Sequence, residues 1–396
     1  MSEKVFGLYL AKEDPESDAY AKLDLPAQPW ELLDALEKLH LQEGDHLYIE
    51  IDNYYDFEEL ATVLRDQEDS LTELNDLAER ITRLNDIQRT ALQGLIQMEK
   101  SKEESGISVS RLRDLAESVD CCHVVREARN DSRLGRFYAE NGFVPEVEGL
   151  PDAVFELLNF EAIGQRARKE EGGVFTTGGY VLQNSDLKQA PPLPSEVAKP
   201  DYMILLEVTN GHRNGPARSG VGPILVKLPA PPKALEEVAE RLKAVSVQEL
   251  WWRCIDCVIP EMRDAATFSN GINDVNCFAQ TLEAMTQEQR KVYKAVLEGL
   301  QCCDLAGAVA LADTLDSYIL RENINSPSEF ARETICAKLE EPLAEKVLDN
   351  LNRHRCGEAL MKEEHCIQTG YGLLRRRDGQ KLSIQKKEIG IMEMRR

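Results

Sequence analysis

The sequence predicts an α+β protein that contains a related unit of about 200 residues twice. The first observation behind this prediction is a set of similar segments that recur in the same order, about 193 to 203 positions apart. The second is the mixture of patterns within each copy, because short apolar runs of strand length alternate with longer segments whose apolar residues recur at helical spacing. The third is the length of 396 residues, which exceeds the size at which single cores stop growing.

The similar segments begin with a Leu-Pro turn. Leu25-Pro26 opens one amphipathic stretch, and Leu228-Pro229 opens another about 203 positions later. Further matches follow in the same order, and the number of positions between matched residues only decreases along the chain. Small deletions in the second copy would produce this decrease. Matched pairs include Leu74 with Val275, Asn75 with Asn276, Gln88 with Gln289, Leu115 with Leu311, Asp120 with Asp316, Phe137 with Phe330, Gly164 with Gly357, and Gly179 with Gly372. The collinear order predicts a tandem duplication.

The repeat also predicts the domain boundaries. The Pro-rich stretch before residue 201 is the best candidate for a linker, because proline and small polar residues interrupt both helices and sheets. The predicted divisions are an acidic first unit at 1–183 with parts of about 1–60, 61–125 and 126–183, a linker at 184–200, a second unit at 201–374, and a basic segment at 375–396.

Within the first unit the patterns predict short strands and a succession of helices. Pro29 is suited to the first turn of a helix whose leucines form one apolar face. Asp56, with Glu59 three residues later, is typical of a capping box that starts a helix. The expected strands are 5–10 and 45–51, and the expected helices are 29–39, 57–65, 71–84, 87–98, 111–119 and 151–160.

Nearly all of the negative charge lies on the first copy. Residues 1–200 carry 41 Asp and Glu against 21 Lys and Arg, whereas residues 201–396 carry 29 against 26. This balance argues against nucleic-acid binding by the first unit, because phosphate contacts require clustered Lys and Arg. The excess is either a solvated surface that aids solubility or a folded surface that competes with DNA phosphates for a basic groove. The candidate partner-binding carboxylates are Glu31, Asp34, Asp45, Glu50, Asp52, Asp56, Glu58, Glu59, Asp66, Glu68, Asp69, Glu73, Asp76 and Glu79.

The first copy resembles the ArdA-type antirestriction proteins over about residues 4–183. The resemblance lies in an N-terminal strand, the turn at Leu25-Pro26, the acidic aromatic segment 51–56, the helix 71–78, and the closing segments 158–164 and 172–180. The second copy departs from the family where acidity is expected, because Trp251-Trp252-Arg253-Cys254 stands where the first copy has Tyr48-Ile49-Glu50-Ile51. This departure puts DNA mimicry by the second copy in doubt.

The resemblance implies an elongated α+β tandem of two ArdA-like units, each built of small consecutive subdomains. It also implies a function, in which acidic side chains arranged like DNA phosphates occupy the DNA-binding groove of type I restriction-modification enzymes. The partner would then be a DNA-binding protein such as a type I methyltransferase core, and no cofactor would be needed. Family members are often dimers, so the tandem implies either a homodimer or a pseudo-dimer within one chain.

No pattern in the sequence favours an enzyme. Cys254 and Cys257 form a Cys-x-x-Cys, but a zinc site needs a second ligand pair and none stands at the usual spacing. The glycines between 172 and 179 lack the Lys-Ser/Thr of a phosphate-binding loop. Ten cysteines without an export signal indicate reduced thiols and hence the cytoplasm, and no apolar run approaches the roughly 18 residues of a membrane helix.

A second interpretation uses the same features differently. The chain would be a non-enzymatic scaffold or regulatory module of a phage or conjugative element, with acidity serving solubility, and its target would be another DNA-binding defence system. The basic segment from Arg375 is open to three interpretations: a solvated tail, an anchor on the acidic copy, or a weak nucleic-acid contact.

Overall fold

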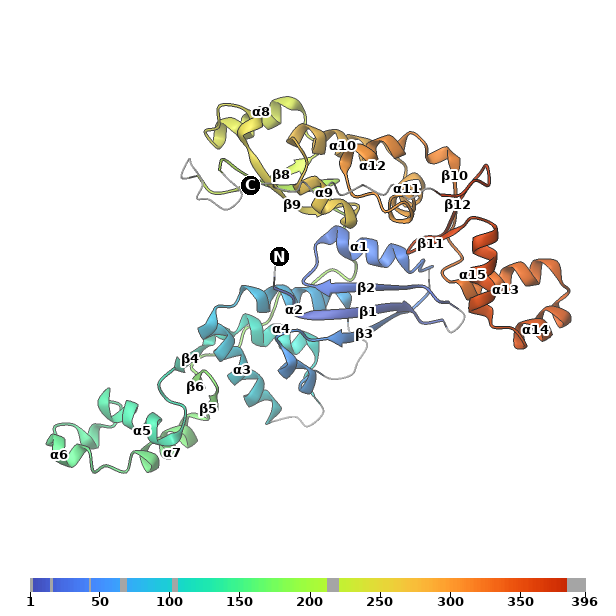
Figure 1. The fold of residues 1–396 in the computed structure, drawn as a ribbon. Coiled ribbons are helices and arrows are strands. Elements are labelled where there is room, and N and C mark those ends of the chain that lie inside the picture. Colours follow the sequence, from blue (N-terminus) through green and yellow to red (C-terminus); the bar gives the residue numbers. More distant parts are fainter. Residues whose placement is uncertain are drawn as a thin grey trace, which may run out of the picture. The chain divides into compact units, whose positions relative to one another are not determined.

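The computed structural model describes residues 3–14, 17–42, 44–64, 70–101, 106–211 and 221–382. These residues form an α+β protein, and Figure 1 shows the elements in chain order. The strands and helices of the first half are β1 (Phe6–Lys12), β2 (Tyr20–Leu25), α1 (Pro29–Lys38), β3 (Leu47–Asn53), η1 (Glu58–Thr62), α2 (Leu71–Arg83), α3 (Asp86–Lys100), α4 (Val109–Glu117), η2 (Val119–Cys121), β4 (Cys122–Val125), α5 (Asp131–Glu140), η3 (Pro145–Val147), α6 (Asp152–Phe155), α7 (Phe160–Glu171), β5 (Val174–Thr176) and β6 (Gly179–Gln183).

The second half has a closely similar order of elements. They are β7 (Ile204–Thr209), β8 (Ile224–Leu228), α8 (Pro232–Arg241), η4 (Val247–Glu249), β9 (Trp251–Cys257), η5 (Pro260–Met262), α9 (Arg263–Thr267), α10 (Ile272–Ala284), α11 (Gln287–Gly299), α12 (Leu305–Ala312), η6 (Leu315–Ser317), β10 (Tyr318–Arg321), α13 (Pro327–Lys338), α14 (Glu341–Asp349), α15 (Arg353–Glu363), β11 (Ile367–Thr369) and β12 (Gly372–Arg376).

The sheets of the two halves also correspond. The described residues form four three-stranded sheets, with strand orders β2-β1-β3 and β4-β6-β5 in the first half and β8-β7-β9 and β10-β12-β11 in the second. In each half, the strand that comes first in sequence (β1 or β7) is the central strand of the first sheet, and the strand that comes last (β6 or β12) is the central strand of the second. Strands β7 and β9 pair antiparallel with a register shift between Leu205 and Leu206.

Compactness divides the chain differently from the repeat. One compact unit, unit 1, comprises residues 1–8, 24–26 and 49–196, and the other, unit 2, comprises residues 9–23, 27–48 and 197–396. The predicted first domain at 1–183 is therefore not one compact body, because the segments 9–23 and 27–48 pack with the second half. A repeat in sequence marks a shared pattern, whereas a compact unit is set by which faces are buried together.

The helices of unit 1 follow the predicted apolar spacing. In α2, Leu74, Leu77, Ala78 and Ile81 are all buried and lie on one face. Asn85 caps α3 by accepting hydrogen bonds from two amides of its first turn, which fixes where that helix begins. The predicted helices at 71–84, 87–98 and 111–119 thus correspond to α2, α3 and α4.

Two predicted helices are shorter in the structure. Within the described residues 57–64 the only helical element is the 3₁₀ turn η1, and Asp56 does not cap it, because Phe57 is the residue that precedes its first turn. Phe57, Leu60 and Val63 are buried three residues apart, which suits the threefold repeat of a 3₁₀ helix. The helix predicted at 151–160 is reduced to the four residues of α6. A new helix, α7, begins at Phe160, because Asn159 caps it by accepting a hydrogen bond from the amide of Ala162 at 3.0 Å.

A close helix crossing explains one of the glycines that match between the copies. A Cβ atom at Gly164 on α7 would lie 1.9 Å from the carbonyl oxygen of Asp131 on α5. A Cβ atom at its counterpart Gly357 on α15 would lie 1.7 Å from the carbonyl oxygen of Pro327 on α13. Both positions therefore require the smallest residue so that two helices can touch.

The predicted linker is bound along part of its length to α4. The amide of Lys188 donates to Ser118 Oγ at 2.9 Å, and the amide of Ala190 donates to Asp114 Oδ1 at 2.8 Å. The guanidinium of Arg113 donates to the carbonyl oxygen of Pro191 at 2.8 Å. This stretch has no helix or strand between 184 and 200, but its backbone is satisfied by fixed partners, so it is not a free linker up to Pro191.

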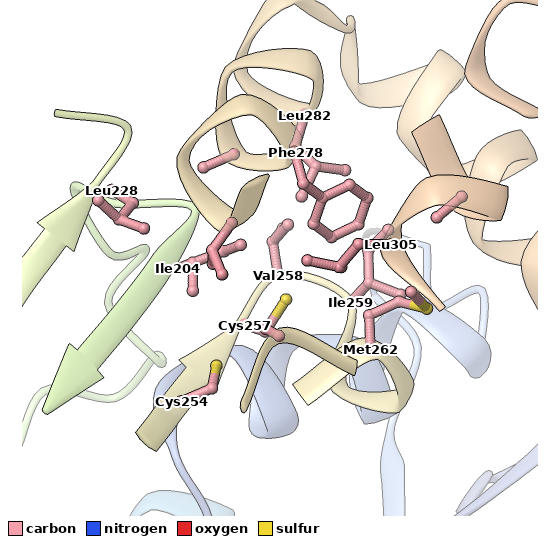
Figure 2. Close-up of a cluster of buried hydrophobic side chains, with 14 of the residues drawn as sticks. Ile204, Leu228, Cys254, Cys257, Val258, Ile259, Met262, Phe278, Leu282 and Leu305 are labelled. Carbon is pink, nitrogen blue, oxygen red and sulfur yellow. The ribbon is translucent and has the colours of Figure 1, made fainter. Parts of the chain in front are cut away.

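Unit 2 has a large apolar core around β7, β9 and α10. Figure 2 shows Cys254 and Cys257 of β9 beside Ile204, Val258 and Phe278 in this core. Both thiols are buried, and burial raises the pKa of each. The Cys-x-x-Cys pattern here belongs to the packing of a strand against a helix.

The predicted basic segment begins inside a sheet. Arg375 and Arg376 are the last residues of β12, which pairs antiparallel with β10. Arg376 forms an ion pair with Asp378 at 2.7 Å, and Arg377 donates to the carbonyl oxygen of Asp316 at 2.8 Å. Residues 383–396, which hold the rest of the predicted segment, lie outside the described residues.

Candidate functional site

The predicted partner-binding carboxylates fall into three environments. One group lies on α1 and just after it and belongs to unit 2, one lies on α2, and one follows β3 into η1. Asp66, Glu68 and Asp69 lie outside the described residues. The three groups differ in whether a cation of this chain already neutralises them.

Asp34 of α1 is a correction to the predicted surface, because its side chain is buried. It is 3% exposed, accepts a hydrogen bond from Tyr371 at 2.7 Å, and forms ion pairs with Lys294 at 2.5 Å and Lys38 at 2.9 Å. Burial alone would raise the pKa of Asp34, but the two ammonium groups outweigh it and the pKa is lowered. Asp34 is therefore an ionised carboxylate inside unit 2 and is not available to a partner.

The other carboxylates of this group are engaged within unit 2. Glu31 pairs with Arg263 at 2.6 Å and accepts from the amide of Gln28 at 2.8 Å, which caps α1. Asp45 pairs with Lys12 at 3.0 Å. Both residues are partly exposed, so they keep some access to solvent, but their charges are matched by neighbouring cations.

The carboxylates of α2 are matched by arginines. Arg113 is almost completely buried, and its guanidinium lies 2.7 Å from Asp76 and 3.2 Å from Glu73. A buried guanidinium requires counter-charges, so these two carboxylates have a structural role. Glu79 forms a more exposed pair with Arg83 at 2.7 Å, one helical turn apart.

The third group lies in solvent. Glu50, Asp52, Asp56, Glu58 and Glu59 are all exposed. Among the described residues, no cation pairs with Asp52, Asp56, Glu58 or Glu59, whose exposed carboxylates succeed one another from β3 into η1. We call these five residues, together with Asp24 at the end of β2, the β3–η1 carboxylates.

Asp24 joins this group although the sequence did not single it out. It ends β2 with an exposed side chain, and a Cβ atom at Gly7 of β1 would lie 2.9 Å from an oxygen of Asp52 and 3.5 Å from an oxygen of Asp24. The two carboxylates thus flank one backbone position. A hydrogen bond to Asp24, together with burial and the charges of Asp24 and Asp52, raises the pKa of Tyr55 to about 12. Only the sheet order β2-β1-β3 brings Asp24 to this place.

The corresponding strand of the second half lacks such a group. Arg253 of β9 stands where the first half has Glu50, and it pairs with Glu207 of β7 at 2.9 Å. Asp256 of the same strand is fully buried and accepts from Trp30 N at 3.2 Å and from Tyr202 Oη at 2.9 Å. Burial raises the pKa of Asp256. The acidic residues of β9 and its neighbours therefore serve packing.

Other kinds of site have little support in the described part of the chain. No group of three or more His, Cys, Asp or Glu side chains is placed there to hold a metal ion. Its helices include none with both the length and the apolar character needed to cross a membrane.

Comparison with known proteins does not assign the chain to a family. No protein-family model matches it, and no curated protein matches it either.

Proposed function

We propose that this chain is an antirestriction protein whose β3–η1 carboxylates imitate DNA phosphates and occupy the DNA-binding groove of a type I restriction-modification enzyme. The observation that carries the proposal is the contrast among the acidic residues of the first half. The carboxylates of α1 and α2 neutralise cations of the chain itself, whereas the exposed carboxylates of Asp52, Asp56, Glu58 and Glu59 have no described cationic partner.

The physical basis is competition for the same Lys and Arg side chains. Duplex DNA carries one negative charge per roughly 1.7 Å of its axis, and proteins that bind it gain affinity from counterion release. Carboxylates held on a sheet edge and a short helical turn present charge with little loss of side-chain freedom on binding. They form charge-assisted hydrogen bonds with basic side chains and steer the encounter electrostatically. Such inhibition needs no turnover and no cofactor.

We also propose that the two halves descend from one duplicated unit that now serves two purposes. The shared order of elements and the paired strand orders support this proposal. The charge of Arg253 at the position of Glu50 supports a different purpose for the second half. That half carries 29 acidic against 26 basic residues, so it lacks the excess charge that mimicry requires.

The test is displacement of DNA from a type I methyltransferase core. A fluorescent duplex bearing the recognition site is held by the core, and increasing amounts of this protein are added at two salt concentrations. We expect displacement that weakens as salt rises. The quadruple variant Asp52→Asn, Asp56→Asn, Glu58→Gln, Glu59→Gln is expected to displace about tenfold less well or worse, because rim charges govern encounter and complementarity.

A matched variant separates surface position from total charge. Glu236→Gln, Glu240→Gln, Glu283→Gln, Glu345→Gln removes four exposed carboxylates from the second half, so its net charge equals that of the first variant. We expect it to displace DNA as well as the natural chain does. If neither the natural chain nor the matched variant displaces DNA, the antirestriction proposal fails. If both variants lose the same activity, the effect is one of net charge and the β3–η1 carboxylates are not the site.

A further inference from the structure

Unit 2 contains a cavity that the proposed function does not use. Its volume is about 930 Å³, and its lining comes from α1, from the residues after it, and from α11 and α13. This size lies within the range of about 300–1,000 Å³ that small-molecule sites occupy. The inference that follows is independent of the proposed antirestriction activity.

One wall of the cavity is apolar. Trp30, Leu33 and Leu36 of α1 line it at spacings of three residues, together with Leu39 and with Val258, which follows β9. Trp30 and Leu39 are buried, and the indole Nε1 of Trp30 donates to the carbonyl oxygen of Tyr202 at 2.9 Å. That hydrogen bond fixes the ring, and the partly exposed side chains of Leu33 and Leu36 present the accessible apolar surface of this wall.

His40 supplies a polar group with unmet hydrogen-bonding capacity. It lies just past the end of α1 and lines the cavity, and both ring nitrogens are buried, with Asn325 nearby but no hydrogen bond of good geometry to a described residue. Burial and the charge of Lys291 lower the pKa of His40, so the ring is neutral and has one donor and one acceptor. Buried polar atoms of this kind normally have a partner, which a ligand or water can provide.

Arg290 supplies a cation that no described carboxylate neutralises. Its guanidinium donates to the thioether sulfur of Met203 at 3.3 Å, which is a weak acceptor. The neighbouring cations differ, since Lys291 pairs with Glu322 at 2.7 Å and Lys294 pairs with Glu37 at 2.8 Å. Lys199, exposed at the edge of the same cavity, also has no described carboxylate partner.

The nearby carboxylates have other partners. Glu329 accepts from the amides of Asp18 and Asn325, and Glu333 pairs with Arg321. Neither of these two carboxylates has a described ion pair with Arg290 or Lys199, although Glu329, whose donors are neutral amides, keeps its negative charge. The cavity combines a fixed apolar wall, a neutral imidazole and cations without a described ion pair.

We propose that this cavity binds a small organic anion that has an apolar body, the anionic group on Arg290 and the body against Trp30, Leu33 and Leu36. His40 donates to or accepts from a polar atom of the same molecule. The carboxylate, sulfonate and phosphate groups all have the required chemistry, because each accepts hydrogen bonds from a guanidinium.

The probe for the test is 1-anilinonaphthalene-8-sulfonate, whose fluorescence rises in apolar surroundings. We expect saturable binding of one probe per full-length chain. The neutral analogue N-phenyl-1-naphthylamine has a similar body without the sulfonate and is expected to bind more weakly. Arg290→Gln is expected to weaken binding of the sulfonate probe about tenfold or more and to leave the neutral analogue unchanged, because it removes a charge-assisted hydrogen bond that only the sulfonate accepts.

Two further variants keep the test decisive. Lys199→Gln changes an exposed residue and is expected to weaken the sulfonate probe by a smaller factor, so it replaces Arg290→Gln if that variant does not fold. Arg241→Gln removes an exposed cation of α8 that does not line the cavity, and it is expected to have no effect. The proposal is overturned if the natural chain shows no saturable site. It is equally overturned if Arg290→Gln and Lys199→Gln bind the sulfonate probe as Arg241→Gln does.

Discussion

The helices α1 and α8 occupy corresponding places in the two halves but have different environments. Each has ten residues, begins with proline, and follows a Leu-Pro turn. At corresponding positions, Trp30 and Asp34 of α1 are buried, whereas Lys233 and Glu237 of α8 have side chains that are 85% and 62% exposed. The helix α1 therefore buries a face that the corresponding helix α8 exposes to solvent.

This difference shows what an acidic residue means in each helix. Asp34 is held by Lys294 of α11, by Lys38 of its own helix, and by the hydroxyl of Tyr371. Among the described residues, Glu237 forms an ion pair only with Lys233, at 3.9 Å and in solvent. A charge count treats the two carboxylates alike, but the first stabilises a packing contact and the second contributes mainly to solubility.

The largest effect is expected at Trp30. Trp30→Ala removes a buried aromatic side chain and should lower the free energy of unfolding of unit 2 by about 3–5 kcal/mol. Lys233→Ala, its counterpart on α8, should change it by less than about 0.5 kcal/mol. Urea unfolding followed by tryptophan fluorescence measures this, because the chain's three tryptophans, Trp30, Trp251 and Trp252, all lie in unit 2. Equal losses in the two variants would contradict the buried position of Trp30.

A somewhat smaller effect is expected at Asp34. Asp34→Ala leaves the buried ammonium of Lys294 with Glu37 as its described carboxylate partner and should cost about 3 kcal/mol, because a broken buried ion pair leaves a charge poorly compensated. Glu237→Ala should cost less than about 0.5 kcal/mol, as an exposed pair contributes little. The same fluorescence-detected urea unfolding compares them. A loss at Glu237 as large as that at Asp34 would show that exposure does not distinguish the two helices.

The smallest expected effect is a pH dependence of stability that Asp34 of α1 confers. Since the pKa of Asp34 is lower in the folded chain than in the unfolded one, its contribution is complete above the unfolded value of about 3.9 and declines as pH falls through the folded value. The stability advantage of the natural chain over Asp34→Asn should be constant from pH 7 to about pH 5 and shrink below about pH 4. Urea midpoints measured across this range test it, and an advantage that grows on acidification would reverse the assigned shift.

Much of the secondary structure could be predicted from local pattern. The helices α2, α3 and α4 fall where apolar residues recur at helical spacing, and Pro29 begins α1 as its fixed backbone angle favours. The helix predicted from Asp56 was wrong, because a capping pattern competes with burial of Phe57, Leu60 and Val63 at a spacing of three residues. Tertiary burial prevailed over the local signal.

The candidate site could be predicted only in part. Asp52, Asp56, Glu58 and Glu59 were found from the density of charge, and the structure leaves them exposed. Asp24 was missed because it stands alone in the sequence and meets Asp52 only across β1. Asp34 was included because a charge count carries no information about burial.

Several helices of the first half, the pattern shared between the halves, and the unequal distribution of charge are predicted from the sequence alone. The helices follow from short-range physics, since spacing, proline, glycine and caps act within a few residues. Which carboxylates face solvent depends on the tertiary structure. Asp34 and Lys294 are 260 positions apart in the sequence, and the lowering of the pKa of Asp34 depends on their contact, which no local pattern encodes.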